Sequence, residues 1–374
     1  MGILACDFID LLGSDFFCGV PDSKLRPFCD ALMTRYGVDP THHIIAANEG
    51  NACAIAAGYH LATGKIPVVY LQNSGEGNII NPLASLLHPD VYGIPVLFVI
   101  GWRGEPDLHD EPQHMVQGGV TLSLLDEFGV AHAIVDTEID ETRLADILHA
   151  WKPLFAQGKS AALIVRKGGL VANEKRSYAN DHTLLREDAL REILRHSGDD
   201  PIVCTTGKSS REIFELREKN GESHDRDFLT VGSMGHASSI ALGIALHSPQ
   251  KRVWCIDGDG AVLMHMGAMA VIAAHAPKTF THVVINNAAH ESVGGLPTVA
   301  GSFTFTSIAL SLGYRYTHRV YDLEGLTSAL NELDSCEGPS LLEICCKMGS
   351  RKDLGRPTIS PQSSKKAFMG HVQG

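Results

Sequence analysis

Short apolar runs alternate with segments of helical periodicity along nearly the whole chain. In the first half, the apolar runs predict strands at Phe16–Cys18, His43–Ala46, Pro67–Leu71, Pro95–Ile100, Ala131–Val135 and Ala161–Val165. Helices are predicted at Ser23–Tyr36, Glu49–Ala62 and Glu141–Ala156. Near-continuous apolar strands that alternate with helices are typical of a parallel sheet covered on both faces.

The second half repeats this pattern. Its strands are predicted at Ile202–Thr205, Phe228–Val231, Val253–Ile256, His282–Ile285, Arg315–Arg319 and Ser340–Cys345. Its helices are predicted at Ser209–Lys219, Ala237–Leu246, Ala261–Ala274 and Leu323–Leu333. The sequence therefore predicts an α/β protein with two tandem, doubly wound parallel-sheet domains.

A polar stretch without helical or strand periodicity separates the two halves. We expect a first domain at residues 1–167, a linker at 168–184 and a second domain at 185–348. Residues 349–374 are rich in Gly, Pro, Ser and Lys, and we expect a loosely packed C-terminal extension there. A chain of 374 residues is long enough for two domains of ordinary size.

Composition narrows the class of protein. The net charge of −12 argues against a nucleic-acid binder, which would normally carry a basic face. We see neither a signal peptide nor an apolar stretch approaching the roughly 20 residues of a membrane helix, so a cytoplasmic location is expected. The nine cysteines lack metal-like spacing, which predicts reduced thiols.

The first candidate binding motif follows the strand predicted at Val253–Ile256. This strand leads into Gly258-Asp259-Gly260, directly before a predicted helix. The glycines permit close approach of a ligand, and the start of the helix offers free N–H groups to an anion. Asp259 would repel that anion unless a cation lay between them, and Mg²⁺ binds such mixed oxygen ligands. The next strand ends in Asn286-Asn287, which would place an amide oxygen beside Asp259 if the two strands are neighbours.

Gly-Asp-Gly followed at this spacing by Asn-Asn resembles the signature of thiamine-diphosphate-dependent enzymes. The resemblance implies that Asp259, Asn287 and the backbone carbonyl of Ala289 hold Mg²⁺ against the cofactor diphosphate. Gly258, Gly260 and Ala261 would lie along the diphosphate. A Rossmann nucleotide site is the competing interpretation, but Gly258-Asp259-Gly260-Ala261-Val262-Leu263 lacks its third glycine.

Two further loops match this family. In Gly232-Ser233-Met234-Gly235, the resemblance implies that Met234 is the apolar wedge that bends the cofactor. It also implies that the carbonyl of Gly232 accepts a hydrogen bond from the pyrimidine amine. The loop at Thr205–Ser210, which contains Gly207, either cradles the diphosphate, binds the anionic end of the substrate, or is a simple turn with an N-cap serine.

Glu49 begins a predicted helix of small residues, where a carboxylate ordinarily favours the helix dipole. The resemblance implies a second role, namely a hydrogen bond to the pyrimidine N1′ that turns the cofactor's own amine into a base. The first half would then be the pyrimidine-binding domain and the second half the diphosphate-binding domain. In this family the two come from different subunits, so a homodimer is the minimum unit expected.

Several loops are similar to those of the phosphonopyruvate decarboxylase family, with sulfopyruvate decarboxylases as near relatives. The matching runs are Gly19-Val20-Pro21-Asp22-Ser23, Gln72-Asn73-Ser74-Gly75, Gly101-Trp102-Arg103-Gly104-Glu105-Pro106, Asp110-Glu111-Pro112-Gln113-His114 and His290-Glu291-Ser292-Val293-Gly294-Gly295. The resemblance implies decarboxylation of 3-phosphonopyruvate, cofactor contact at Asn73, and a pathway of phosphonate synthesis. A donor-rich pocket must bind the phosphonate, and its candidates are Ser23, Lys24, Arg103, Lys208 and Arg211. His114 and His290 are expected to act in catalysis as proton donors or substrate contacts.

Two positions depart from the family pattern. Glu76 stands where an apolar residue, usually Leu, is expected, and Ala288 stands where Gly is expected after Asn-Asn. A carboxylate at Glu76 either disturbs the active-site loop or faces solvent, and we expect the solvent-facing arrangement.

Three alternatives remain. Sulfopyruvate decarboxylases perform the same chemistry, but they usually divide the two domains between two polypeptides, which favours the phosphonate substrate here. Thiamine-dependent carboligases typically carry a third, middle domain, for which the predicted linker leaves no room. A catalytically inactive relative should have lost Glu49 or Asp259, and both are present.

Overall fold

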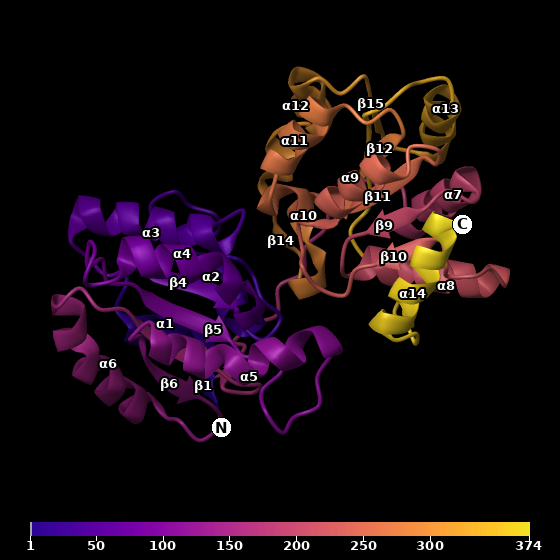
Figure 1. Ribbon diagram of the computed structural model, residues 1–374. Coiled ribbons are helices and arrows are strands. Elements are labelled where there is room, and N and C mark those ends of the chain that lie inside the picture. The colour runs from indigo at the N-terminus through magenta and orange to yellow at the C-terminus, as the bar shows by residue number, and fades with distance from the viewer. Residues whose placement is uncertain (1) are drawn as a thin grey trace. The chain divides into compact units, whose positions relative to one another are not determined.

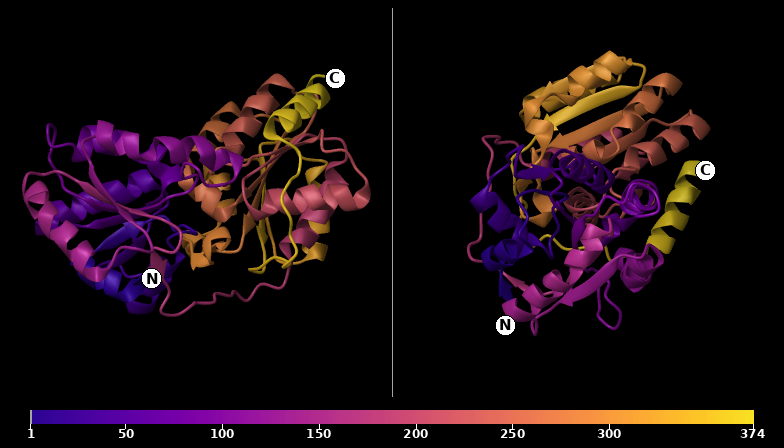
Figure 2. Two further views of the ribbon diagram at one scale, coloured as in Figure 1. Left: turned by 90° about the horizontal axis from the view of Figure 1, so that it is seen from below. Right: turned by 90° about the vertical axis from the view of Figure 1, so that its left-hand side faces the viewer.

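The computed structural model describes residues 2–374 and divides the chain into two compact units, Met1–Ser177 and Tyr178–Gly374. Their boundary lies within the segment predicted as the linker. Each unit contains a six-stranded sheet in which all neighbouring strands are parallel, with helices on both faces (Figure 1; Figure 2). The prediction of two tandem doubly wound α/β domains is therefore confirmed.

The sheet of the first unit has the strand order β3-β2-β4-β5-β7-β6. Its strands are β2 (Phe17–Gly19), β3 (His43–Ile45), β4 (Val68–Gln72), β5 (Leu97–Gly101), β6 (Ala131–Val135) and β7 (Ala161–Val165). Its helices are α1 (Ala5–Leu12), α2 (Arg26–Arg35), α3 (Glu49–Thr63), α4 (Glu76–Pro82), α5 (Pro112–Glu127) and α6 (Glu141–Ala156). Two short strands, β1 (Ile3–Leu4) and β8 (Leu170–Val171), pair separately, and short helical turns η1 (Asn73–Gly75) and η2 (Leu83–Leu87) flank α4.

The sheet of the second unit has the order β10-β9-β11-β12-β16-β15. Its strands are β9 (Ile202–Cys204), β10 (Asp227–Leu229), β11 (Val253–Gly258), β12 (Phe280–Asn286), β15 (Tyr316–Val320) and β16 (Ser340–Cys345). Its helices are α7 (Arg186–Ser197), α8 (Lys208–Asn220), α9 (Ala237–His247), α10 (Asp259–Met264), α11 (Gly267–His275), α12 (Phe305–Leu312), α13 (Leu323–Leu333) and α14 (Pro361–Gln373). A short hairpin, β13 (Ala289–His290) with β14 (Leu296–Pro297), and the turns η3 (Glu291–Val293) and η4 (Val299–Ser302) complete it.

Alternating side chains of the strands in this sheet enter two separate cores. Trp254 and Ile256 of β11 belong to one hydrophobic cluster, with α7 and α13. Val253 and Cys255 of the same strand belong to the other, with α9 and α12. A strand that is buried on both faces has no polar alternation, which explains why these strands read as continuous apolar runs.

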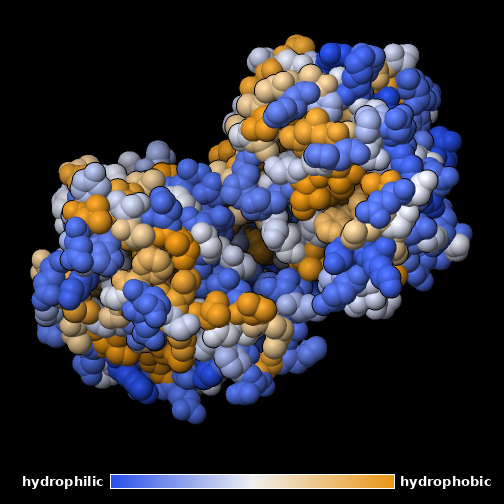
Figure 3. Space-filling model, viewed as in Figure 1, coloured by the Kyte–Doolittle hydropathy of each residue, from blue (hydrophilic) through white to orange (hydrophobic). Residues whose placement is uncertain are grey.

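The structure differs from the predicted elements in identifiable places. The helix expected at Ala261–Ala274 is two helices, α10 and α11, since the backbone of His265 leaves the helical region with φ −137° and ψ 47°. Helix α5 was not predicted because it has no sustained apolar stripe. Its Met115, Val116 and Val120 are exposed, and Figure 3 shows such apolar areas among polar ones on the surface of both units.

The C-terminal extension, which was expected to be loosely packed, ends in a helix, α14, that the sequence did not predict. Ser360 caps α14 by accepting a hydrogen bond from the N–H of Ser363. Phe368 is buried against Phe228, with ring centroids 5.5 Å apart. Lys251 donates from Nζ to the carbonyl of His371 at 2.6 Å. Phe368, together with the partly buried Val372, therefore anchors this helix beside β10.

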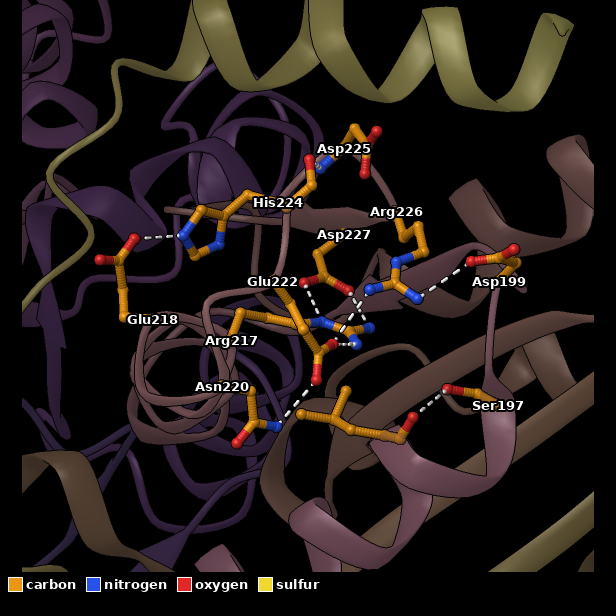
Figure 4. A network of polar contacts seen from close by, with 12 residues as sticks. Ser197, Asp199, Arg217, Glu218, Asn220, Glu222, His224, Asp225, Arg226 and Asp227 are labelled. Carbon is orange, nitrogen blue, oxygen red and sulfur yellow. Dashed lines mark hydrogen bonds and ion pairs between the residues drawn. The ribbon is translucent and has the colours of Figure 1, made fainter.

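A buried ion-pair network ties α8 to β10 (Figure 4). Arg217, whose side chain is 1% exposed, donates from Nε and Nη2 to the carboxylate of Asp227, both at 3.0 Å. Glu222 also pairs with Arg217 and joins it to Arg226. At the rim, Arg226 pairs with Asp199, whose side chain is 93% exposed.

This network predicts unequal effects of two substitutions. Asp227→Ala should lower the free energy of unfolding by roughly 3–5 kcal/mol, because it leaves the Arg217 guanidinium buried without its main partner. Asp199→Ala removes an exposed partner and should cost less than about 1 kcal/mol. Urea denaturation of both variants measures the difference, and equal effects would contradict the buried role of Asp227.

Candidate active site

Two neighbouring strands end together in the second unit. Strand β11 pairs in parallel with β12, and Gly258 lies opposite Ile285. Asp259, directly after Gly258, therefore leaves the sheet beside the Asn286-Asn287 turn, as the sequence predicted. Asp259 is 3% exposed and accepts a hydrogen bond on Oδ2 from Thr298 Oγ1 at 2.5 Å. Burial raises the pKa of Asp259 to about 6, so a cation beside it would offset the cost of its charge.

Asn287 is buried, and both ends of its side-chain amide are engaged. Nδ2 donates to Glu291 Oε2 at 2.6 Å, while Oδ1 accepts from the backbone N–H of Ala289 at 3.1 Å. Ala288, which lies between Asn287 and Ala289 in the chain, has a left-handed φ of 55°. This conformation explains why glycine is the residue expected at that position. Carboxylate, amide and backbone oxygens are the ligands that Mg²⁺ prefers, so Asp259, Asn287 and Ala289 fit that ion.

Gly260 brings two other predicted residues close to the start of α10. A Cβ atom at Gly260 would lie 3.4 Å from His290 Cε1 and Nδ1 and 3.4 Å from the Met234 Cε methyl group. Burial lowers the pKa of His290 to about 4, which keeps the imidazole neutral at neutral pH. Met234 follows Ser233, which has a left-handed φ of 52°, and Gly232 precedes it in the same loop between β10 and α9. Ala261 continues α10.

The cations predicted for the second unit have partners of their own. Lys208, which follows Gly207 at the start of α8, donates from Nζ to Glu291 Oε1 at 2.7 Å. Arg211 donates to the carbonyls of Leu354 and Gly355 at 2.5 and 2.6 Å. The structure therefore places Lys208 beside the Asn287 turn and directs Arg211 to the C-terminal segment.

In the first unit, Glu49 begins α3 and is 5% exposed. Asn78 donates from Nδ2 to Glu49 Oε2 at 2.7 Å. A Cβ atom at Gly75 would overlap the Glu49 carboxyl group, so a larger residue there would displace that side chain. Burial raises the pKa of Glu49, which favours a neutral carboxyl group able to donate a hydrogen bond.

Three predicted substrate residues of the first unit lie together. Arg103 pairs with Asp110 through Nε at 2.7 Å and through Nη2, and it approaches Ser23 Oγ at 3.4 Å. Lys24 donates its backbone N–H to Asp22 Oδ2 at 3.0 Å. Burial, and then the charge of Arg103, lower the pKa of Lys24. Asp22 and Asp110 were not singled out from the sequence, although both belong to the matching loops and face the cations.

Asn73 and His114 lie at the edges of this cluster. The Asn73 amide donates to the Arg103 carbonyl at 2.8 Å and to Thr121 Oγ1 at 3.0 Å, and it accepts from the Arg103 N–H at 2.9 Å. This side chain therefore holds two loops together. His114, in the first turn of α5, packs its backbone carbonyl against Gly104.

Glu76 does not face solvent, and that expectation was wrong. Its side chain is fully buried and accepts hydrogen bonds on Oε2 from Gln117 Nε2 at 2.6 Å and Thr121 Oγ1 at 3.1 Å. Both partners belong to α5, a helix that the apolar pattern did not reveal. Burial raises the pKa of Glu76 to about 8, so this carboxyl group is largely protonated at neutral pH.

Asp259 and Asn287 offer oxygen atoms at the carboxyl edge of one parallel sheet, and Glu49 is buried in the other domain. This arrangement fits the class of thiamine-diphosphate-dependent enzymes. Residues 4–127 match the N-terminal TPP binding domain of thiamine pyrophosphate enzymes, and residues 205–344 match their C-terminal TPP binding domain. The chain belongs to the thiamine pyrophosphate enzyme family.

Individual relatives are similar over most of their length. The chain is 36% identical to phosphonopyruvate decarboxylase of Streptomyces viridochromogenes, over 96% of this chain and 92% of the relative. It is 35% identical to phosphonopyruvate decarboxylase of Streptomyces hygroscopicus, over 96% and 90%. It is 30% identical to sulfopyruvate decarboxylase of Methanosarcina acetivorans, over 86% and 85%. The predicted resemblance is therefore confirmed.

The buried carboxyl group of Glu76 predicts a pH-dependent stability. The folded protein keeps this proton until about pH 8, whereas an unfolded glutamate releases it near its ordinary value of 4.5. Within that window unfolding releases the proton, so stability falls as pH rises, by up to about 1.4 kcal/mol per pH unit. Glu76→Leu should remove this contribution.

Urea denaturation at a series of pH values measures the difference between wild type and Glu76→Leu. The advantage of the leucine variant should grow through this window and level off above it. Glu76→Gln, which keeps an acceptor for Gln117, is the matched control and should lose the same pH dependence. A constant difference between wild type and both variants would contradict the assignment.

Proposed function

We propose that this protein decarboxylates 3-phosphonopyruvate to phosphonoacetaldehyde and CO₂, with thiamine diphosphate and Mg²⁺. The observation that carries the proposal is the 36% identity to phosphonopyruvate decarboxylase, which extends over 96% of this chain. Thiamine diphosphate, when bound, supplies an electron sink for the pair of electrons that remains when CO₂ leaves a 2-oxo acid. The residues of the chain must bind the cofactor, orient the substrate beside it and supply the proton that replaces CO₂.

Each domain, taken by itself, offers groups suited to one part of the cofactor. Asp259, Asn287 and the carbonyl of Ala289 would hold Mg²⁺, while the start of α10 offers free N–H groups to the diphosphate. Met234 and the carbonyl of Gly232 would orient the pyrimidine. Glu49 would hold a proton on its sheltered carboxyl group and donate it in a hydrogen bond to the pyrimidine ring nitrogen.

Substrate recognition is proposed for the cluster of Ser23, Lys24 and Arg103. Two cations and a hydroxyl group suit a doubly charged phosphonate, for which charge-assisted hydrogen bonds are the strong contacts. His114 and His290 are proposed to donate or position the proton that replaces CO₂. Lys208 lies beside the proposed Mg²⁺ ligand Asn287, and Arg211 binds the carbonyls of the C-terminal segment. Ser23, Lys24 and Arg103 lie together, so we place the phosphonate there, where Asp110 also pairs with Arg103.

Sulfopyruvate is the alternative substrate. From the sequence, two domains on one chain counted as evidence against sulfopyruvate. However, the sulfopyruvate decarboxylase of Methanosarcina acetivorans aligns with 86% of this single chain. Possession of both domains on one polypeptide therefore does not discriminate between the two acids. The preference for phosphonopyruvate rests on the higher identity to its decarboxylases.

The substrate proposal predicts a higher kcat/KM for 3-phosphonopyruvate than for sulfopyruvate. The measurement follows the aldehyde product at saturating thiamine diphosphate and Mg²⁺. Arg103→Met should raise KM for both acids, because it removes a cation from the proposed acid-binding cluster. A clear preference of the wild-type protein for sulfopyruvate would overturn the assignment of the substrate.

The cofactor proposal predicts that substitutions of Glu49 and Asp259 affect different steps, namely turnover and cofactor binding. Glu49→Gln should still bind thiamine diphosphate but lose most turnover, by about 10²–10⁴-fold, because the acid–base contact is lost. Asp259→Ala should weaken the binding of Mg²⁺ and cofactor together. Calorimetric titration with a parallel activity assay separates the two, and wild-type turnover in Glu49→Gln would refute its role.

We also propose a homo-oligomer, at least a dimer, that acts in the cytoplasm in phosphonate and antibiotic biosynthesis. The exposed Met115, Val116 and Val120 of α5 offer an apolar surface suited to a subunit contact. No helix among residues 2–374 is long and apolar enough to cross a bilayer. Sedimentation analysis of the full chain tests the oligomeric state.

A further inference from the structure

Glu291 is a nearly buried carboxylate four residues beyond Asn287, and three donors converge on it. Its side chain is 10% exposed and belongs to the short turn η3. Oε2 accepts from Asn287 Nδ2 at 2.6 Å and from Arg186 Nη1 at 2.7 Å, while Oε1 accepts from Lys208 Nζ at 2.7 Å. These donors come from three elements, namely the end of β12, α7 and α8.

The contact between Asn287 and Glu291 decides which end of the amide is available to a metal. Because the anionic Glu291 holds Nδ2, the amide oxygen is left on the opposite side. That oxygen accepts one hydrogen bond, from the Ala289 N–H at 3.1 Å, and retains a second lone pair. A flipped amide would set Oδ1 against the carboxylate of Glu291 and turn two N–H donors toward the cation, and both arrangements are repulsive.

Glu291 is itself fixed from the interior of the domain. Arg186 is 5% exposed and holds Glu212 through two parallel hydrogen bonds of 2.7 Å, from Nε and Nη2. Glu212 belongs to α8 and is 2% exposed, so Arg186 is anchored to buried structure. A bidentate arginine–carboxylate pair adds geometric specificity as well as energy. The position of Glu291 therefore depends on α7 and α8.

The same contacts give Lys208 a role. Its ammonium group is paired with Glu291, and it therefore neutralises part of the negative charge beside Asn287. Residues that orient a metal ligand through a hydrogen bond commonly change metal affinity by about 10–100-fold when they are removed.

We propose that Glu291 is a positioning residue for the metal ligand Asn287, and that Arg186 and Lys208 act through it. The inference rests on the proposed Mg²⁺ site and adds to it a set of residues that presents the Asn287 oxygen to the ion. It also transfers Lys208 from substrate binding to metal positioning.

The test is calorimetric titration of Mg²⁺ into the apoenzyme at saturating thiamine diphosphate. Glu291→Ala should raise the Mg²⁺ dissociation constant by about 10–100-fold. Glu291→Gln keeps an acceptor for Asn287 and should retain part of the affinity, and it carries the test if the alanine variant does not fold. Glu212→Gln is the comparison variant, since it weakens the anchor of Arg186 without touching Asn287. It should lower thermal stability and raise the Mg²⁺ dissociation constant less than Glu291→Ala does.

The outcomes separate this inference from the proposed function. Wild-type Mg²⁺ affinity in both Glu291 variants, or equal losses in Glu291→Ala and Glu212→Gln, would overturn the positioning role and leave the metal site standing. Failure of the wild-type protein to bind Mg²⁺ would overturn the metal site itself. Lys208→Met should raise the Mg²⁺ dissociation constant, whereas a rise in substrate KM alone would return Lys208 to substrate binding.

Discussion

The parallel pairing of β11 with β12 is the constraint on which the proposed metal and diphosphate site depends. Gly258 opposite Ile285 sets the register, and that register brings Asp259 and the Asn286-Asn287 turn to one edge of the sheet. Parallel strands end at the same edge, where open α/β sheets bind their ligands. A slip of one residue would send these side chains to opposite faces of the sheet. The two apolar clusters on either side of β11 prevent such a slip.

The buried carboxyl groups of the two domains differ in their neighbours, and this difference matches the different roles proposed for Glu49 and Glu291. Glu49 and Glu76 are sheltered among uncharged donors, and burial raises the pKa of each. Such surroundings favour a protonated group, which for Glu49 matches a hydrogen-bond donor to the cofactor. Glu291 is paired with two cations, Arg186 and Lys208, which favours a charged group that orients other residues. The difference lies in the partners rather than in the degree of burial.

The C-terminal segment contributes to the scaffold of the second domain. Arg211 of α8 donates to the carbonyls of Leu354 and Gly355, and the N–H of Gly355 donates to Glu215 of the same helix. Helix α14 then packs Phe368 beside β10. Because α8 also carries Lys208 and Glu212, these contacts support the elements that hold Glu291. The segment therefore stabilises the domain near the proposed metal site.

The sequence by itself determined the two sheets, the Gly258-Asp259-Gly260 turn and the candidate ligands Asp259 and Asn287. These features are local, because an apolar run predicts a buried strand and a glycine turn predicts where that strand ends. Only the tertiary structure decided that Glu76 is buried, that Lys208 pairs with Glu291 and that Phe368 anchors the C-terminal helix. Glu76 meets α5 some forty residues later, and Lys208 meets Glu291 across 83 residues. Such contacts depend on how elements far apart in the sequence pack together. A local pattern of polar and apolar residues does not predict that packing.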